Sequence, residues 1–261
     1  MPCCAKGTVI DAASFTAIRL ISGALVLGLI VRTTRRSVVG EGNWGSAVVL
    51  FVYAIAFSFA YADLSAATGA LLLFVAVQAT MIGYGIWAGE QLSRPQIAGI
   101  LLALGGLTGL MLPGLAAPPV VSALLMLSAG VAWGVYSLRG KQAGDPTKVT
   151  AGNFIRAALI AAALSLIVLM RGEAALDTAG FWYAVSSGAV ASGLGYVIWY
   201  SVLPALRATT AATVQLSAPV IAAFGGVMLL GESISLRLVL ASVAILGGIA
   251  LVILAKRAVA P

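Results

Sequence analysis

The sequence predicts an all-α polytopic membrane protein, and three observations support this prediction. Of its 261 residues, 61% are hydrophobic and only 9% are charged, and the mean hydropathy is +1.09. A soluble domain is about a quarter charged, so this chain has too few polar side chains to cover a surface in water. The apolar residues form long runs, and a helix that spans a bilayer needs about 20 of them. A lipid-facing β-barrel would instead show alternating segments of about ten residues.

Nine apolar runs, each bounded by charged residues, glycine or proline, are the predicted membrane spans. The connections between them are mostly short, so we expect successive helices to be antiparallel neighbours. The predicted spans are 13–32, 44–62, 65–88, 95–113, 118–138, 150–170, 180–203, 209–231 and 236–255.

Basic residues follow every second predicted span. On the opposite side of the membrane the only basic residues expected are Lys6, Arg171 and Arg237. The positive-inside rule makes the basic side cytoplasmic, so we expect the C-terminus in the cytoplasm and the protein in the bacterial inner (plasma) membrane. Topology then explains the net charge of +7, and no nucleic-acid partner is predicted. The ten residues on the basic side are Arg32, Arg35, Arg36, Arg94, Arg139, Lys141, Lys148, Arg207, Lys256 and Arg257.

Residues 71–112 resemble residues 213–254 at a constant offset of 142. Each segment has an apolar span, a Gly-Glu pair, a turn with serine, and a second span with a Gly-Gly pair. Ile18-Arg19 and Ile155-Arg156 open earlier spans at a slightly shorter offset. The matched pairs are Gly83 and Gly225, Glu90 and Glu232, Ser93 and Ser235, and Gly105-Gly106 and Gly247-Gly248.

Equivalent spans in this repeat are five apart, so they would cross the membrane in opposite directions. Such an inverted-topology repeat is the architecture of alternating-access transporters. We therefore expect a first repeat at 1–114 and a second at 115–257. The span at 118–138 has no partner, so the chain has the pattern of a five-plus-five protein without its first helix.

The chain resembles the drug/metabolite transporter superfamily, in its EamA-like branch. The resemblance rests on segments that carry an arginine, a Gly-Glu and Gly-Gly pattern, a Trp-Gly helix, and a proline break. It implies export or exchange of small metabolites, with amino acids and drugs as candidate cargoes and with no cofactor. The matching segments are FTAIRLISGA (15–24), NFIRAA (153–158), 89–106, 231–248, AGVAWGVY (129–136) and LSAPV (216–220).

Two departures from the family pattern are present. The first helix of the usual ten is missing, either because the start is truncated or misassigned or because this is a natural nine-helix variant. In addition, VAVQA (75–79) stands where the first repeat would have its proline break.

Arg19 and Arg156 lie a few residues inside their predicted spans. A charge at the centre of a bilayer costs about 2.5–3.5 kcal/mol on insertion scales. The arginines are therefore either structural, holding neighbouring helices, or substrate-steering, attracting an anionic group. Glu90 and Glu232 end their spans and are predicted to be structural, paired with Arg94 and Arg237, rather than to carry protons.

Polar and aromatic residues deep in the spans are the predicted cavity residues. Buried amides need partners, and a proline frees a backbone carbonyl one turn earlier. Helix breaks of this kind line substrate sites in inverted-repeat transporters. The substrate-cavity candidates are Gln78, Trp133, Tyr136, Tyr196, Trp199, Tyr200, Gln215 and Pro219.

The predicted partners are the lipid bilayer and a small-molecule substrate. Small-residue motifs such as Gly85-x-x-x-Gly89 and Gly105-x-x-x-Gly109 permit close helix packing, within one chain or in a homodimer. The predicted function is a secondary transporter, specifically an exporter. The sequence has no histidine and no metal-ligand cluster, so an intramembrane enzyme is the weaker hypothesis. An inactive or truncated transporter-like protein is the other alternative.

Overall fold

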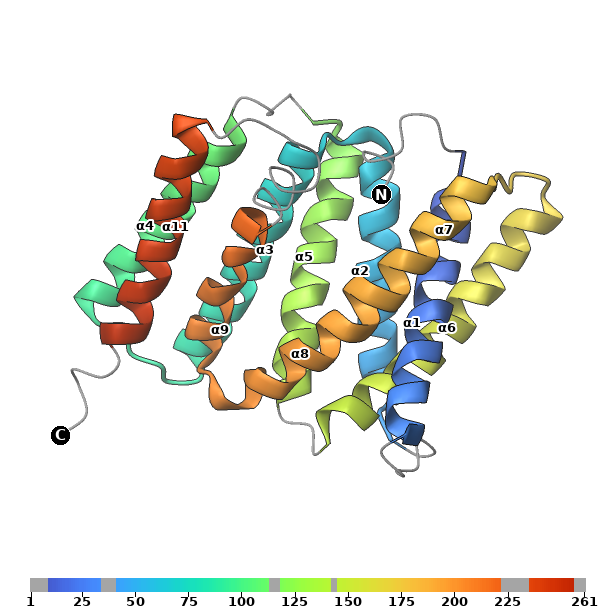
Figure 1. The fold of residues 1–261 in the computed structure, drawn as a ribbon, viewed down its shortest axis with the longest axis horizontal. Coiled ribbons are helices and arrows are strands. Elements are labelled where there is room, and N and C mark those ends of the chain that lie inside the picture. Colours follow the sequence, from blue (N-terminus) through green and yellow to red (C-terminus); the bar gives the residue numbers. More distant parts are fainter. Residues whose placement is uncertain (1–8, 34–40, 113–117, 142–144, 222–234, 256–261) are drawn as a thin grey trace. The chain divides into compact units, whose positions relative to one another are not determined.

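The computed structural model describes residues 9–33, 41–112, 118–141, 145–221 and 235–255. They are almost wholly helical, and the one β-bridge among them joins Ile10 to Leu176. Figure 1 shows the helices in chain order. They are α1 (Ala12–Thr33), α2 (Trp44–Asp63), α3 (Ala66–Trp87), α4 (Arg94–Met111), α5 (Val120–Lys141), α6 (Pro146–Met170), α7 (Thr178–Ser186), α8 (Gly195–Val202), α9 (Ala208–Gln215) and α11 (Leu236–Ala255).

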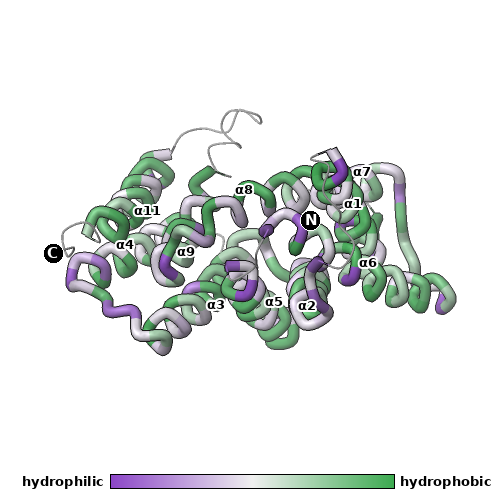
Figure 2. Tube along the Cα trace, turned by 90° about the horizontal axis from the view of Figure 1, so that it is seen from below, coloured by the Kyte–Doolittle hydropathy of each residue, from purple (hydrophilic) through white to green (hydrophobic). Residues whose placement is uncertain are grey.

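Seven of the described helical segments are long and apolar enough to cross a membrane. Large apolar side chains such as Leu25 and Leu169 are more than half exposed, and Figure 2 shows hydrophobic colouring along the helices. Because such surfaces are stable only in lipid, the prediction of an all-α integral membrane protein is confirmed. Each predicted span matches a helix to within a few residues, except 209–231, of which residues 222–231 lie outside the described part of the chain.

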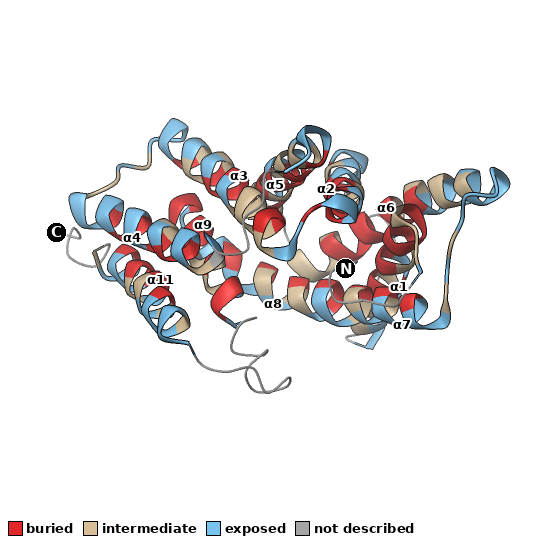
Figure 3. Cartoon of the chain, turned by 90° about the horizontal axis from the view of Figure 1, so that it is seen from above, coloured by how far each residue is buried: buried red, intermediate tan, exposed pale blue. Residues whose placement is uncertain are grey.

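The chain folds into two compact units, and each unit takes residues from both halves of the sequence. The first unit contains residues 1–64 and 118–205, and the second contains 65–117 and 206–261. In Figure 3 most helices have a buried side and an exposed side. The boundaries of these units differ from those of the predicted repeats at 1–114 and 115–257. The repeats therefore stay a prediction from the sequence.

In the first unit, α2 packs along α5, and α1 packs on α6 and on the segment after α7. That segment, Ser187–Leu194, is π-helical and connects α7 to α8 without a break. Gly188 allows the close approach, because a Cβ on it would overlap the Ser22 hydroxyl and the Arg19 carbonyl on α1. The start of α1 is tied to the loop before α7 by the Asp11 carboxylate, which accepts from the Ala175 N–H at 3.0 Å.

In the second unit, α4 packs on α11 and α3 packs on α9. Glycine on both partners brings α4 and α11 together, since a Cβ on Gly99 would lie only 2.6 Å from the Gly248 carbonyl oxygen. Helix α9 ends at Gln215, and helical structure resumes at 217–221 after a turn at Leu216. The buried core of this unit is Ala103, Leu107, Leu216, Val220, Ile245 and Ile249.

Three of the four pairs of spans that are equivalent in the predicted repeat contact each other within these units. The first and sixth spans meet as α1 and α6, the third and eighth as α3 and α9, and the fourth and ninth as α4 and α11. The Gly105-x-x-x-Gly109 motif contributes Gly106 to the α4–α11 contact, whereas Gly105 and Gly109 line an open groove beside it.

Candidate substrate site

Arg19 is a buried charge in the first unit, placed on α1 where this helix faces α2 and the π-helical segment. Its Nε donates to the Ser192 hydroxyl at 3.0 Å and one Nη donates to the Tyr53 hydroxyl at 3.3 Å. The guanidinium also lies 5.5 Å from the ring centroids of Tyr53 and Phe57, within the range of cation–π attraction. These partners are all neutral.

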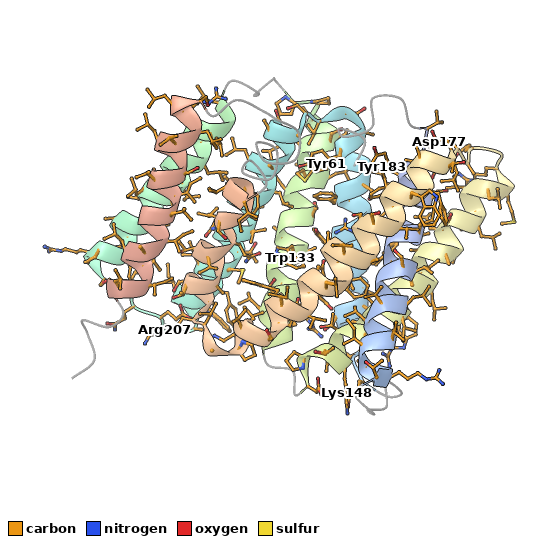
Figure 4. The ribbon with its side chains drawn as sticks, viewed as in Figure 1. Tyr61, Trp133, Lys148, Asp177, Tyr183 and Arg207 are labelled. Atoms are coloured by element: carbon orange, nitrogen blue, oxygen red, sulfur yellow. The ribbon has the colours of Figure 1, made fainter. Side chains whose placement is uncertain are left out.

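A cluster of aromatic rings continues from Arg19 across the first unit. Trp133, at the middle of α5 in Figure 4, lies with its ring centroid 5.1 Å from that of Tyr53 and 5.0 Å from that of Tyr196. Tyr136 lies 6.3 Å from Tyr196 and 5.7 Å from Tyr200. The structure thus brings four of the predicted cavity residues together: Trp133, Tyr136, Tyr196 and Tyr200. We call these four rings and Tyr53 the aromatic cluster.

Several buried polar atoms in and beside the aromatic cluster make no hydrogen bond of good geometry with the described residues, although the Tyr200 hydroxyl lies near that of Ser137 and the Tyr196 hydroxyl lies near that of Tyr53. They are the hydroxyls of Tyr196, Tyr200 and Ser137 and the Trp199 Nε1. Buried polar groups in proteins are nearly always hydrogen-bonded, and each unsatisfied one costs about 1–3 kcal/mol. Several such atoms beside flat apolar faces are the features of a ligand site, which needs a few polar groups in apolar surroundings.

Gln78, Gln215 and Pro219 lie in the second unit. The Gln78 Nε2 donates to the Ala212 carbonyl at 2.7 Å, and its Oε1 has no partner among the described residues. The Gln215 Nε2 lies 3.1 Å from the Met81 sulfur. Both amides therefore connect α3 with α9. Pro219 lies just after the interruption of the helix at Leu216. Because proline has no N–H, it cannot donate to the carbonyl four residues earlier, so an interruption of the helix is expected at this place.

Glu90 caps a helix that is distant in sequence. Its carboxylate accepts from the N–H groups of Ala208 and Thr209 at 2.8 and 3.2 Å, and from the Thr209 hydroxyl at 2.7 Å. These bonds place a negative charge at the N-terminus of α9, where the helix dipole favours it. Glu90 therefore holds the start of α9, a partner that the sequence did not indicate, and its expected pairing with Arg94 stays a prediction. Glu232 lies outside the described residues.

Arg156, which the predicted repeat pairs with Arg19, donates to backbone carbonyls. One Nη donates to the carbonyls of Glu41 and Gly152 at 2.7 and 2.9 Å, and the guanidinium lies 5.9 Å from the ring centroid of Trp44. These contacts connect the segment before α2 with α6.

Sequence reasoning missed three residues of this site: Tyr53, Ser192 and Asn153. Asn153 connects the site to the chain before α2, because it donates to the Tyr136 hydroxyl at 3.4 Å and accepts from the Asn43 N–H at 2.9 Å. A polar residue in the middle of an apolar span was the available signal for Tyr53. Ser192 had no such signal, since it lies in a run of small residues.

Comparisons with known proteins agree with this fold. The chain is 54% identical over 249 residues to uncharacterized protein PA1977 of Pseudomonas aeruginosa, covering 95% of this chain and 86% of that protein. It is 22% identical over 249 residues to the uncharacterized transporter YoaV of Bacillus subtilis, covering 90% and 85%. One solved structure, described only as the crystal structure of a protein, matches with a TM-score of 0.79 at 22% identity, covering 97% of this chain and 91% of that one.

The model of the EamA-like transporter family matches residues 120–254, which is most of the predicted second repeat. This match covers more than half of the chain, and the polytopic helical fold is the one that such a transporter requires. The chain therefore belongs to the EamA-like transporter family.

Proposed function

We propose that this protein is a secondary transporter that exports small organic metabolites from the cytoplasm by alternating access. The observation that carries the proposal is the aromatic cluster, in which the hydroxyls of Tyr196 and Tyr200 make no well-formed hydrogen bond with the described residues. Flat faces and a few polar atoms suit cargoes such as amino acids or aromatic drugs. The family membership supports transport as the activity, and neither a cofactor nor a catalytic step is part of the proposal.

The orientation is also part of the proposal. The basic residues of alternate loops place the C-terminus in the cytoplasm under the positive-inside rule, in the inner membrane of a bacterium. The break after Gln215 supports alternating access, because interrupted helices with freed carbonyls occur at the binding sites of inverted-repeat transporters.

The test is transport by purified protein in sealed vesicles without ATP. Vesicles are loaded with labelled amino acids and small aromatic compounds, and efflux and counterflow are measured. We expect the protein to accelerate the flux of at least one compound relative to protein-free vesicles. Equal flux with and without protein across the whole panel would refute the proposal.

A set of variants locates the site within the molecule. Tyr196→Ala removes a ring of the aromatic cluster, and Gln78→Ala removes the amide that joins α3 and α9. We expect either to reduce flux by about tenfold or more, since loss of one buried polar or stacking contact is worth ~1.4 kcal/mol or more. Glu90→Gln keeps the shape of the α9 cap and is expected to reduce flux less at equal expression. The reverse order would move the site toward the helix ends.

A further inference from the structure

The charge of Arg19 has no opposite charge beside it in the described part of the chain. Its hydrogen bonds go to the hydroxyls of Ser192 and Tyr53, and its flat faces lie against rings. A buried cation normally has an anionic partner, because burial without one is costly. Arg19 therefore differs from an arginine whose charge serves only to hold the fold together.

The guanidinium also has donors to spare. It carries five N–H groups, and Ser192 and Tyr53 each accept one. Arg19 is 7% exposed, whereas Thr16 and Leu20 on the same helix are 0% and 1% exposed. The two hydroxyls hold the side chain in one orientation while some of its surface remains uncovered.

Arg156 provides the comparison within the same chain. At the equivalent position of the repeat, its Nη1 is bound to two backbone carbonyls. Carbonyl oxygens carry the partial negative charge that a structural arginine needs. Among the described residues Arg19 donates to two hydroxyls and to no backbone carbonyl. One of these hydroxyls belongs to Tyr53, a member of the aromatic cluster whose ring contacts Trp133.

We infer that Arg19 is the anion-binding group of the substrate site, and that the cargo carries a carboxylate or a similar anion next to a flat apolar part. The guanidinium would bind the anion through its free N–H groups, as such a fork does with carboxylates. The aromatic cluster would hold the apolar part. This inference rests on the proposed transport function, which it deepens by naming a class of substrate.

The experiment compares matched pairs of compounds that differ only in charge. Phenylacetate is compared with phenylacetamide, and N-acetylphenylalanine with its amide. Binding is measured as thermal stabilisation of the purified full-length protein, and as competition in the counterflow assay. We expect the wild-type protein to bind the carboxylate of a pair about tenfold or more tightly than the amide, as the loss of a charge-assisted hydrogen bond predicts.

Variants assign this preference to a residue. Arg19→Gln removes the charge and is expected to abolish the preference for the carboxylate. Arg19→Lys keeps the charge without the planar fork and is expected to retain part of it. Arg156→Gln is the matched control and is expected to lower stability while leaving the preference unchanged. If Arg19→Gln does not elute as a folded protein, Arg19→Lys and Tyr53→Phe test instead whether the preference for carboxylates depends on the Arg19 side chain and on the hydroxyl that it donates to.

The outcomes separate this inference from the proposed function. Flux without any preference for carboxylates overturns the inference and leaves transport standing. Binding of carboxylates that depends on Arg19, without flux of any compound, supports Arg19 as an anion-binding group and refutes transport. A preference that persists in Arg19→Gln, or no preference in any pair, overturns it.

A lipid headgroup could supply the same anionic chemistry. Thermal stabilisation is therefore also measured with phosphatidylcholine alone and with added phosphatidylglycerol. Stabilisation by phosphatidylglycerol that is lost in Arg19→Gln, together with no response to the carboxylates, would make the anion a lipid and overturn a substrate site.

Discussion

At the residue scale, the two repeat-related arginines have partners of different kinds. Arg156 is bound to the carbonyls of Glu41 and Gly152, while Arg19 is bound to the hydroxyls of Ser192 and Tyr53. Positions that the predicted repeat makes equivalent therefore have different hydrogen-bond partners in the structure. The choice between a structural and a substrate-steering role, which the sequence leaves open, has a different answer for each residue in our proposal.

Asp11 is the residue for which the structure predicts a pH dependence. It lies just before α1, where it accepts from the N–H groups of Ser14 and Ala175 at 2.8 and 3.0 Å. Burial raises its pKa, but the hydrogen bonds from Ser14, Ala175 and Ala13 lower it by more, so the pKa lies below its ordinary value of 3.8. A carboxylate with a lowered pKa stabilises the fold above its unfolded pKa, and this contribution is lost as the pH falls through the folded value.

We therefore expect Asp11→Asn to lower the melting temperature at neutral pH, because an amide cannot accept both N–H groups. The difference from wild type should shrink as the pH falls below about 4. Melting curves of the two proteins in the same detergent across this range provide the measurement. A constant difference at all pH values would show that the charge of Asp11 does not matter.

At the element scale, the π-helical segment interrupts the α-helical geometry between α7 and α8 in the first unit. Ser187–Leu194 sits between two α-helices, and π-helical turns occur frequently at functional sites. Here the segment carries Ser192, which orients Arg19. Gly188 in the same segment allows the segment to pack closely against α1. The packing of this segment on α1 and the orientation of the Arg19 side chain therefore depend on each other.

Replacing Gly188 by alanine is expected to disturb this contact. The new Cβ would meet the Ser22 hydroxyl and the Arg19 carbonyl, and overpacking of this kind costs about 1–3 kcal/mol. Gly28→Ala on α1 is the control, because nothing lies within 4 Å of its Cβ, and there alanine should stabilise the helix by up to about 1 kcal/mol. Thermal unfolding of both variants checks the contrast, and similar shifts for both would contradict it.

At the scale of the whole molecule, the predicted orientation can be tested at the two ends of α6. Figure 4 shows Lys148 at one end of this helix, and Arg171 follows its other end. In a protein with Cys3 and Cys4 replaced by serine, we expect Arg171→Cys to react with a membrane-impermeant maleimide in intact cells. Lys148→Cys should react only after permeabilisation. The opposite pattern would reverse the proposed topology.

The spans and much of the site could be predicted because both depend on local signals. Long apolar runs located the helices, and aromatic residues in mid-span located Trp133, Tyr136, Tyr196 and Tyr200. The rest depends on contacts between distant segments. Nothing near Glu90 indicates that its partners are Ala208 and Thr209, and no local pattern distinguishes the π-helical turn from the α-helices on either side.

The interleaving of the two halves in each unit has a consequence for biosynthesis. Helix α1 is among the first to leave the ribosome, but Ser192 lies 173 residues further along the chain. Until that segment is inserted, Arg19 has the α2 residues Tyr53 and Phe57 beside it but lacks the Ser192 hydroxyl. The second unit likewise lacks α9 and α11 until its last 56 residues, 206–261, are made. The early helices must therefore wait in the membrane with incomplete partners, a stage at which insertion chaperones and quality-control proteases have their best access to the nascent protein.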